Sequence, residues 1–140
     1  MKVDAFGAFL GCRFAIPEMV KGGGGSIINM VSMAGYGNNT GGRAGYGMSK
    51  AAAMNLTRTI AHSYMKDGVR ANGIAPAVVG TERIRKQLAA LPEAKAAMAG
   101  QPMGVIDPED IGYAAIFLAS DESKMITGHV IPIHAGSFGD

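Results

Sequence analysis

The alternation of apolar and polar positions divides the chain into short strand-like runs and longer helix-like stretches. Three short, nearly continuous apolar runs are typical of parallel strands that are covered on both faces. They predict strands over residues 26–32, 69–75 and 129–133. The first run reads SIINMVS, and Pro76 closes the second.

Helical patterns occupy the stretches between these runs. Apolar residues recur there at helical spacing, which predicts helices over residues 5–20, 44–65, 81–99 and 107–120. Pro17 is expected to bend or end the first helix because proline lacks a backbone N–H. The sequence Asp107-Pro108-Glu109-Asp110 predicts a helix start, since aspartate caps helices and acidic residues favour their positive end. Residues 33–45 and the glycine run 22–25 are predicted to be loops.

The order of these elements indicates the fold class. Strands separated by helical crossovers form a parallel sheet with right-handed connections. We therefore predict a single α/β domain over residues 1–140, with about three parallel strands and flanking helices. Such a sheet is thin, and its first strand would leave an open apolar edge that normally requires a partner.

Composition and charge narrow the classes of partner. The net charge of the 140 residues is +2, and their Lys and Arg residues are dispersed, so no nucleic-acid surface is expected. No apolar run approaches the roughly 18 residues of a membrane span, and no signal peptide is evident. We therefore expect no membrane partner and a cytoplasmic protein. Cys12 is the only cysteine, which fits a reducing compartment. No metal site is expected, because His62 and His129 lack metal-like spacing with it.

Tyr46 and Lys50 are the first candidates for chemistry. They are four residues apart at the start of a predicted helix, so their side chains share one face. A tyrosine has a reference pKa of about 10, and a cation held beside a phenol favours its charged form. Such a pair can act as a general acid and base. Ser32, at the end of the first predicted strand, could hold a substrate oxygen.

By itself the pair also fits an ordinary helix surface, because short motifs recur by chance. It becomes informative within a series of short blocks around it. These are SIINMVSMAG over residues 26–35, YGMSKA over 46–51, VRANGIAP over 69–76, DPEDI over 107–111, FLAS over 117–120 and ITG over 126–128. Together, the blocks resemble the short-chain dehydrogenase/reductase family, and the resemblance extends through almost the whole chain.

The resemblance implies roles for the residues that match. Ser32 would orient the substrate and Tyr46 would be the acid/base. Lys50 would favour the phenolate and hold the nicotinamide ribose, so Tyr46 and Lys50 would both touch the cofactor. Residues 76–81 would form the loop at the nicotinamide carboxamide, and residues 82–104 the variable substrate-binding segment. The positions in that loop expected to bind the cofactor are Pro76, Ala77, Val79 and Thr81.

The family resemblance also implies the reaction and the partners. It predicts NAD- or NADP-dependent hydride transfer between a small-molecule alcohol and a carbonyl compound. The fold would be a partial Rossmann-like, doubly wound sheet from which the N-terminal dinucleotide-binding half is missing. That half carries the residue that selects the cofactor, so NAD and NADP cannot be told apart. Homo-oligomers are expected, both from the family and from the apolar helices.

Asp4 is the clearest departure from the family pattern at the site. It aligns with an asparagine that helps to relay protons, so it is a candidate catalytic residue whose charge would alter the surroundings of Tyr46 and Lys50. Ala77 replaces a usual glycine. The methionines beside the serine, Met30 and Met33, are interpreted as core residues rather than pocket residues.

Two further hypotheses concern other classes of function. One is a truncated, non-catalytic chain that acts only as an assembly or binding module, favoured by the apolar helix over residues 5–20 and the open strand edge. The other is a serine hydrolase. It is disfavoured because Val31-Ser32-Met33-Ala34-Gly35 lacks the glycine two positions before the serine that a nucleophile elbow uses.

Overall fold

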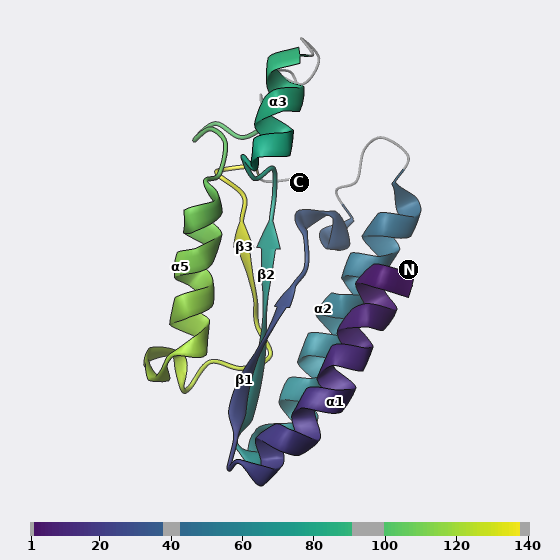
Figure 1. Ribbon diagram of the computed structural model, residues 1–140, viewed down its shortest axis with the longest axis vertical. Coiled ribbons are helices and arrows are strands. Elements are labelled where there is room, and N and C mark those ends of the chain that lie inside the picture. The colour runs from purple at the N-terminus through teal and green to yellow at the C-terminus, as the bar shows by residue number, and fades with distance from the viewer. Residues whose placement is uncertain (1, 38–42, 91–99, 138–140) are drawn as a thin grey trace.

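Three parallel strands form one sheet with helices on both faces (Figure 1). The structure is a computed structural model that describes residues 2–37, 43–90 and 100–137. The strands are β1 (Gly25–Met30), β2 (Val69–Pro76) and β3 (Val130–Ile133), in the spatial order β1-β2-β3. Gly25 pairs with Val69, and Gly73 pairs with Val130. The predicted α/β class with three parallel strands is confirmed.

Two helices cover one face of the sheet and one helix covers the other (Figure 1). α1 (Gly7–Lys21) and α2 (Ala44–Tyr64) lie side by side on the first face, and α5 (Pro108–Ala119) lies on the second. α3 (Glu82–Ala90) stands beyond the ends toward which the strands point. A π-helical turn, Lys2–Phe6, precedes α1. Three short 3-10 turns follow β1, α2 and α5, at Met33–Tyr36, Met65–Asp67 and Asp121–Ser123.

The core lies mainly between β2 and the helices, because β2 is paired on both sides. Val69 and the residues from Ala71 to Ala75 are buried. Where α1 meets the sheet, Cys12 is 5% exposed and packs in a cluster with Ile16. Burial raises the pKa of the Cys12 thiol, and the hydrogen bond from its Sγ to Asn29 Oδ1 acts in the opposite direction. On the other face, Leu118 of α5 is fully buried.

Several sequence predictions are corrected at the ends of elements. Pro17 does not end α1, which continues to Lys21. Pro17 is exposed, so water can replace the single backbone hydrogen bond that proline removes. β1 ends at Met30, although Val31 still donates its N–H to Ile74 O at 2.9 Å. The predicted loop over 33–45 contains a 3-10 turn, and residues 38–42 and 91–99 lie outside the described residues.

The glycine run after α1 lies in close contact with the turn that precedes β2. Gly24 has φ +132°, and a Cβ on it would lie 2.6 Å from the carbonyl oxygen of Gly68. Gly68 itself has φ +74° and begins the turn into β2. The prediction of a loop is correct for residues 22–24 but wrong for Gly25, which begins β1. Gly24 and Gly68 are required by their close backbone approach rather than by flexibility.

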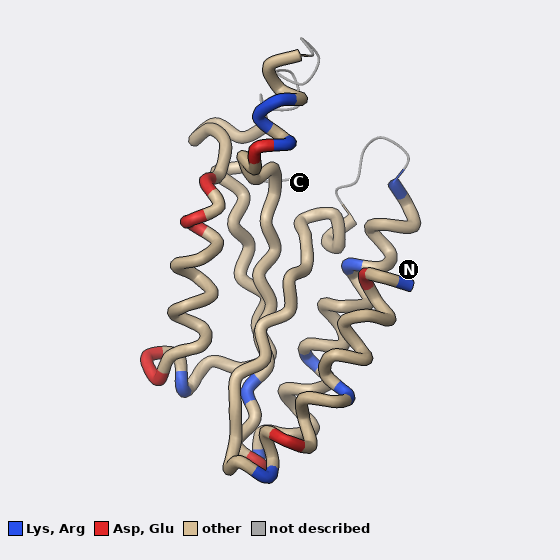
Figure 2. The backbone as a smooth tube through the Cα atoms, in the orientation of Figure 1, with Lys and Arg blue, Asp and Glu red and all other residues tan. Residues whose placement is uncertain are grey.

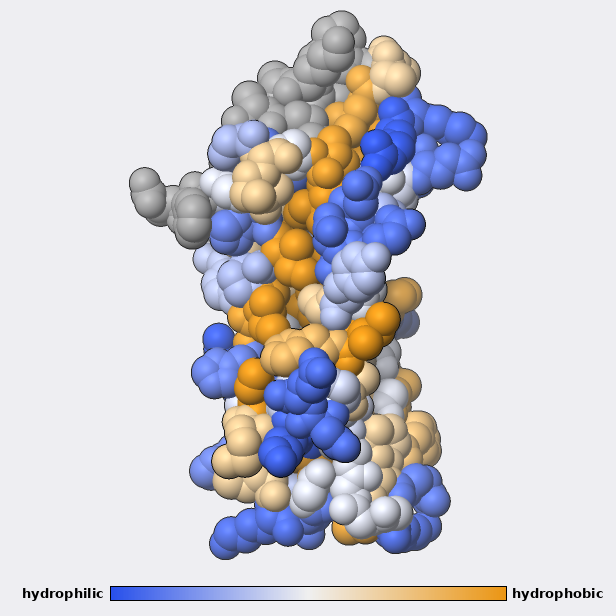
Figure 3. All heavy atoms as spheres, turned by 90° about the vertical axis from the view of Figure 1, so that its left-hand side faces the viewer, coloured by the Kyte–Doolittle hydropathy of each residue, from blue (hydrophilic) through white to orange (hydrophobic). Residues whose placement is uncertain are grey.

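Apolar surface remains exposed on both helical layers. Phe14 of α1 is 71% exposed, and Ile116 of α5 is 67% exposed. Figure 3 shows apolar surface on the side of the molecule where α5 lies. β1 is an edge strand that pairs only with β2 within the described sheet. In the part of the chain that the structure describes, no helix is long and apolar enough to cross a membrane.

Asn72, in the middle of β2, ties the sheet to the segment that enters β3. Its side chain is fully buried. Its Nδ2 donates to Ile126 O at 2.8 Å, and its Oδ1 accepts the N–H of His129 at 3.1 Å. The amide therefore satisfies two backbone groups of the segment that enters β3.

We predict that Asn72→Ala lowers the free energy of unfolding by about 1–3 kcal/mol, because it removes both hydrogen bonds of a fully buried amide. Asn55→Ala, at an exposed position of α2, is the matched control. It should change the free energy by less than about 0.7 kcal/mol, since alanine is the better helix former. Urea denaturation of both variants measures the difference. Equal, small effects would show that the Asn72 amide does not hold the two segments together.

Candidate active site

A pocket of about 710 Å³ opens at the carboxyl ends of β1 and β2. Parallel strands place these ends at one edge of the sheet, and the start of α2 lies at the same edge (Figure 1). Of the predicted site residues, those that line the pocket are Ser32, Tyr46, Pro76, Ala77, Val79 and Thr81. Asp4 and Lys50 do not line it but form a pair next to Tyr46.

Ser32 lies two residues beyond β1 in extended backbone and caps the 3-10 turn that follows. Its Oγ accepts the N–H of Ala34 at 3.2 Å. The same turn packs tightly on α2 at Gly35. A Cβ there would lie 2.6 Å from Met54 Sδ and 3.0 Å from the carbonyl carbon of Lys50. Any larger residue at Gly35 would therefore push the Ser32 turn away from the helix that carries Tyr46.

Tyr46 and Lys50 lie one turn apart near the start of α2. The Nζ of Lys50 is 5.6 Å from the centroid of the Tyr46 ring. The Lys50 side chain is only 14% exposed, whereas Tyr46 is 39% exposed. The predicted face-sharing pair is thus present, with a shielded cation beside a tyrosine that is open to the pocket.

The Lys50 ammonium is held from two directions. It donates to Met30 O, at the end of β1, at 3.2 Å. It also lies 3.3 Å from Asp4 Oδ1, in the π-helical turn before α1. These contacts join three elements at one charged group. The family resemblance predicts that the charge of Asp4 alters the surroundings of Tyr46 and Lys50, and the structure brings Asp4 into direct contact with Lys50.

The segment after β2 is fastened by backbone hydrogen bonds. Ala77 N–H donates to Ile133 O at 2.9 Å, and Gly80 N–H donates to Ile106 O at 2.8 Å. Val78 N–H donates to Oε1 of Gln101 at 2.7 Å. Gln101 is 4% exposed and no sequence pattern pointed to it. These hydrogen bonds hold the backbone of residues 77–80 in place where it forms the wall of the pocket.

Sequence reasoning missed two basic side chains that line the pocket, Arg43 and Arg83. Arg43 immediately precedes α2, three positions before Tyr46, and Arg83 follows Thr81 by two positions. Their nearness in sequence to predicted site residues was the available signal. Met33 lines the pocket and also packs on the core. The interpretation of Met30 as a core residue is wrong, because it is 47% exposed.

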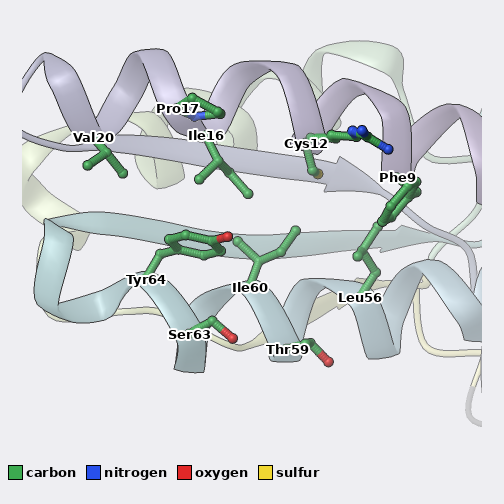
Figure 4. Close-up of a pocket in the computed structure, with 11 residues that line it drawn as sticks. Phe9, Cys12, Ile16, Pro17, Val20, Leu56, Thr59, Ile60, Ser63 and Tyr64 are labelled. Atoms are coloured by element: carbon green, nitrogen blue, oxygen red, sulfur yellow. The ribbon is translucent and has the colours of Figure 1, made fainter.

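A second hollow, of about 720 Å³, lies between α1 and α2. Figure 4 shows that mainly apolar side chains from both helices point into it. Among them, Phe9 is 43% exposed and Val20 is 37% exposed. The hollow is separate from the residues at the strand ends, since it shares none of the residues that line the first pocket.

Known proteins are similar to this chain over almost its whole length. A family model described as "Enoyl-(Acyl carrier protein) reductase" matches residues 1–137. The 2,5-dichloro-2,5-cyclohexadiene-1,4-diol dehydrogenase LinX of Sphingobium indicum is 41% identical over 136 residues, covering 96% of this chain and 53% of the relative. The 2-keto-3-deoxy-L-fuconate dehydrogenase of Xanthomonas campestris is 37% identical, covering 97% of this chain and 47% of the relative.

Solved structures give the same result. A 7α-hydroxysteroid dehydrogenase, complexed with NADH and 7-oxo glycochenodeoxycholic acid, superposes with a TM-score of 0.86 at 32% identity. The similarity covers 95% of this chain and 52% of that one. The chain spans about half the length of the curated relatives it matches. The family model over nearly the whole chain, with these relatives and the matching fold, shows that the chain belongs to the short-chain dehydrogenase/reductase family.

Proposed function

We propose that this protein interconverts an alcohol and a carbonyl compound by hydride transfer, with Tyr46 as the acid/base and NAD or NADP as the cofactor. The single observation that supports it most is the shielded Lys50 ammonium 5.6 Å from the ring of Tyr46, beside a pocket that Ser32 also lines. A cation beside a phenol favours proton exchange at the phenol oxygen. The named dehydrogenases among the relatives support the same reaction class.

The residues of the pocket fit a nicotinamide. Its wall after β2 combines apolar side chains with the hydroxyl of Thr81, which suits a flat ring that carries a carboxamide. In the proposal, Pro76, Ala77, Val79 and Thr81 contact that ring, and Lys50 and Tyr46 contact the ribose beside it. The bound group would supply the hydride acceptor or donor. A solved relative complexed with NADH supports this assignment.

The protein residues handle the proton and the orientation of the substrate. In the oxidative direction, Ser32 Oγ hydrogen-bonds the substrate hydroxyl, and the Tyr46 oxygen accepts the hydroxyl proton. The substrate C–H bond breaks, and its two electrons leave with the hydride, which an oxidised nicotinamide would accept, so the alcohol becomes a carbonyl compound. In the reductive direction, Tyr46 returns the proton to the substrate oxygen. Asp4 is proposed to act indirectly, by holding Lys50 in place at 3.3 Å. Residues 82–104 are proposed to bind the rest of the substrate.

A non-catalytic assembly module is the second candidate. The hollow between α1 and α2 and the edge strand β1 favour it, since both offer apolar or hydrogen-bonding surface to another chain. Assembly is also part of the first proposal. We propose that α1 and α2 pack against a second copy, because Phe9 and Val20 remain partly exposed along the hollow.

We predict that Tyr46→Phe lowers kcat by at least about a hundredfold, because the ring stays but the proton-transferring oxygen is lost. The rate is followed by the absorbance of reduced nicotinamide in the natural full-length polypeptide. Tyr113→Phe, at a 70% exposed position of α5, removes the same atom away from the pocket and is the control. Turnover that survives Tyr46→Phe would refute the proposed mechanism. Absence of both turnover and calorimetric binding of NADH and NADPH would favour the non-catalytic module.

We predict that the protein sediments as an oligomer, and that Phe9→Glu shifts it toward the monomer because a charge would be buried at the α1–α2 surface. Sedimentation velocity over a range of concentrations measures the change. Met125→Glu, at an 89% exposed apolar position on another part of the molecule, is the matched control and should leave assembly intact. A wild-type protein that stays monomeric at high concentration would contradict the proposed interface.

A further inference from the structure

Both charged side chains that line the candidate pocket are basic. Its charged lining residues are Arg43 and Arg83, and no aspartate or glutamate lines it among the residues that the structure describes. The other polar side chains of the lining are the hydroxyls of Ser32, Tyr46 and Thr81. Figure 2 shows basic positions in α3 and at the beginning of α2, both at the end of the molecule toward which the strands point. The pocket therefore attracts a negative group.

Arg83 makes only a neutral side-chain hydrogen bond, within the described residues. Its Nη1 donates to the amide oxygen of Gln87 at 3.3 Å. Arg85, two residues later, is the contrast: it donates to Gly80 O at 2.8 Å and binds the carboxylate of Asp107. The charge of Arg85 is thus balanced by the protein, whereas among the described carboxylates none pairs with Arg83.

Arg43 adjoins the helix that carries the proposed acid/base. It is the residue before α2 and makes no side-chain capping bond to the helix. The first turn of α2 contains no acidic residue that would offset the positive end of the helix dipole. Arginine carries five N–H donors in a planar fork, so Arg43 can keep contacts within the protein and still bind a carboxylate.

Two negative groups could meet these arginines, since a nicotinamide cofactor carries phosphates as well. Arg83 adjoins the segment after β2 that is proposed to contact the cofactor. Arg43 adjoins Tyr46, where the reacting oxygen of the substrate would lie. In our assignment, the cofactor phosphates lie on the side of Arg83, and Arg43 is left for the substrate.

We propose that the substrate is a hydroxy or oxo acid whose carboxylate binds Arg43 while its reacting oxygen lies at Ser32 and Tyr46. This rests on the proposed oxidoreductase function and deepens it by naming the substrate class. The carboxylate takes no part in the bond changes. Its ion pair with Arg43 fixes the acid in the pocket, so the specificity for acids over neutral alcohols depends on this one guanidinium.

The test compares oxo acids with their methyl esters in the full-length polypeptide. The wild-type protein should show a kcat/KM at least about tenfold higher for the acid, and Arg43→Gln should lower the acid-to-ester ratio by about 10- to 100-fold, mainly through KM. Arg58→Gln, at an exposed position farther along α2, is the matched control and should keep the ratio. The KM values of NADH and NADPH are measured for each variant.

Each outcome decides the proposal. Equal kcat/KM for acid and ester, or equal losses for both in Arg43→Gln, would overturn it while leaving the oxidoreductase function in place. A rise in the cofactor KM with an unchanged ratio would assign Arg43 to the cofactor and also overturn it. If no substrate turns over, calorimetric titration with an oxo acid decides: binding lost in Arg43→Gln but kept in Arg58→Gln supports the proposal, and no binding overturns it.

Discussion

The parallel pairing of β2 with both of its neighbours is the constraint on which the rest of the structure depends. Because β1, β2 and β3 run in one direction, their carboxyl ends meet at one edge of the sheet. Ser32 follows β1 and Pro76 ends β2, so both reach the same pocket. The crossover helix α2 must begin at that edge in order to return to the start of β2, and this brings Tyr46 to the pocket as well.

A small set of contacts then sets the spacing within the site. Gly35 allows the turn after Ser32 to approach the backbone of α2 closely. Lys50 links α2 to the end of β1 and to Asp4 through one ammonium group. Gln101 fixes the backbone of Val78 from outside the sheet. The residues of the pocket come from separate elements, and their mutual positions depend on these local contacts rather than on the sheet alone.

The periodic parts of the chain could be predicted from the sequence. The three apolar runs correspond to the three strands, because burial on two faces requires a continuous run of apolar residues. The helix start at Asp107 corresponds to the start of α5, because helix capping favours particular residues. The course of α1 through Pro17 could not be predicted, since it depends on exposure. The pocket-facing directions of Arg43 and Arg83, and the burial of Gln101, arise only when distant segments pack together. The burial of a residue also cannot be inferred from that of a residue nearby in the sequence. Met33 faces the core and the pocket, while Met30 is exposed.

The register of the sheet also governs the order in which the protein can fold. Gly25 meets Val69 and Gly73 meets Val130, so each pair of strands closes a long loop before any backbone hydrogen bond between strands is gained. During synthesis, β1 is completed before β2 is available to pair with it. Its apolar residues must then be sheltered by α1, or by a chaperone, until α2 has formed and β2 follows. The topology that brings the site residues to one edge of the sheet therefore makes the formation of the site a late step in folding.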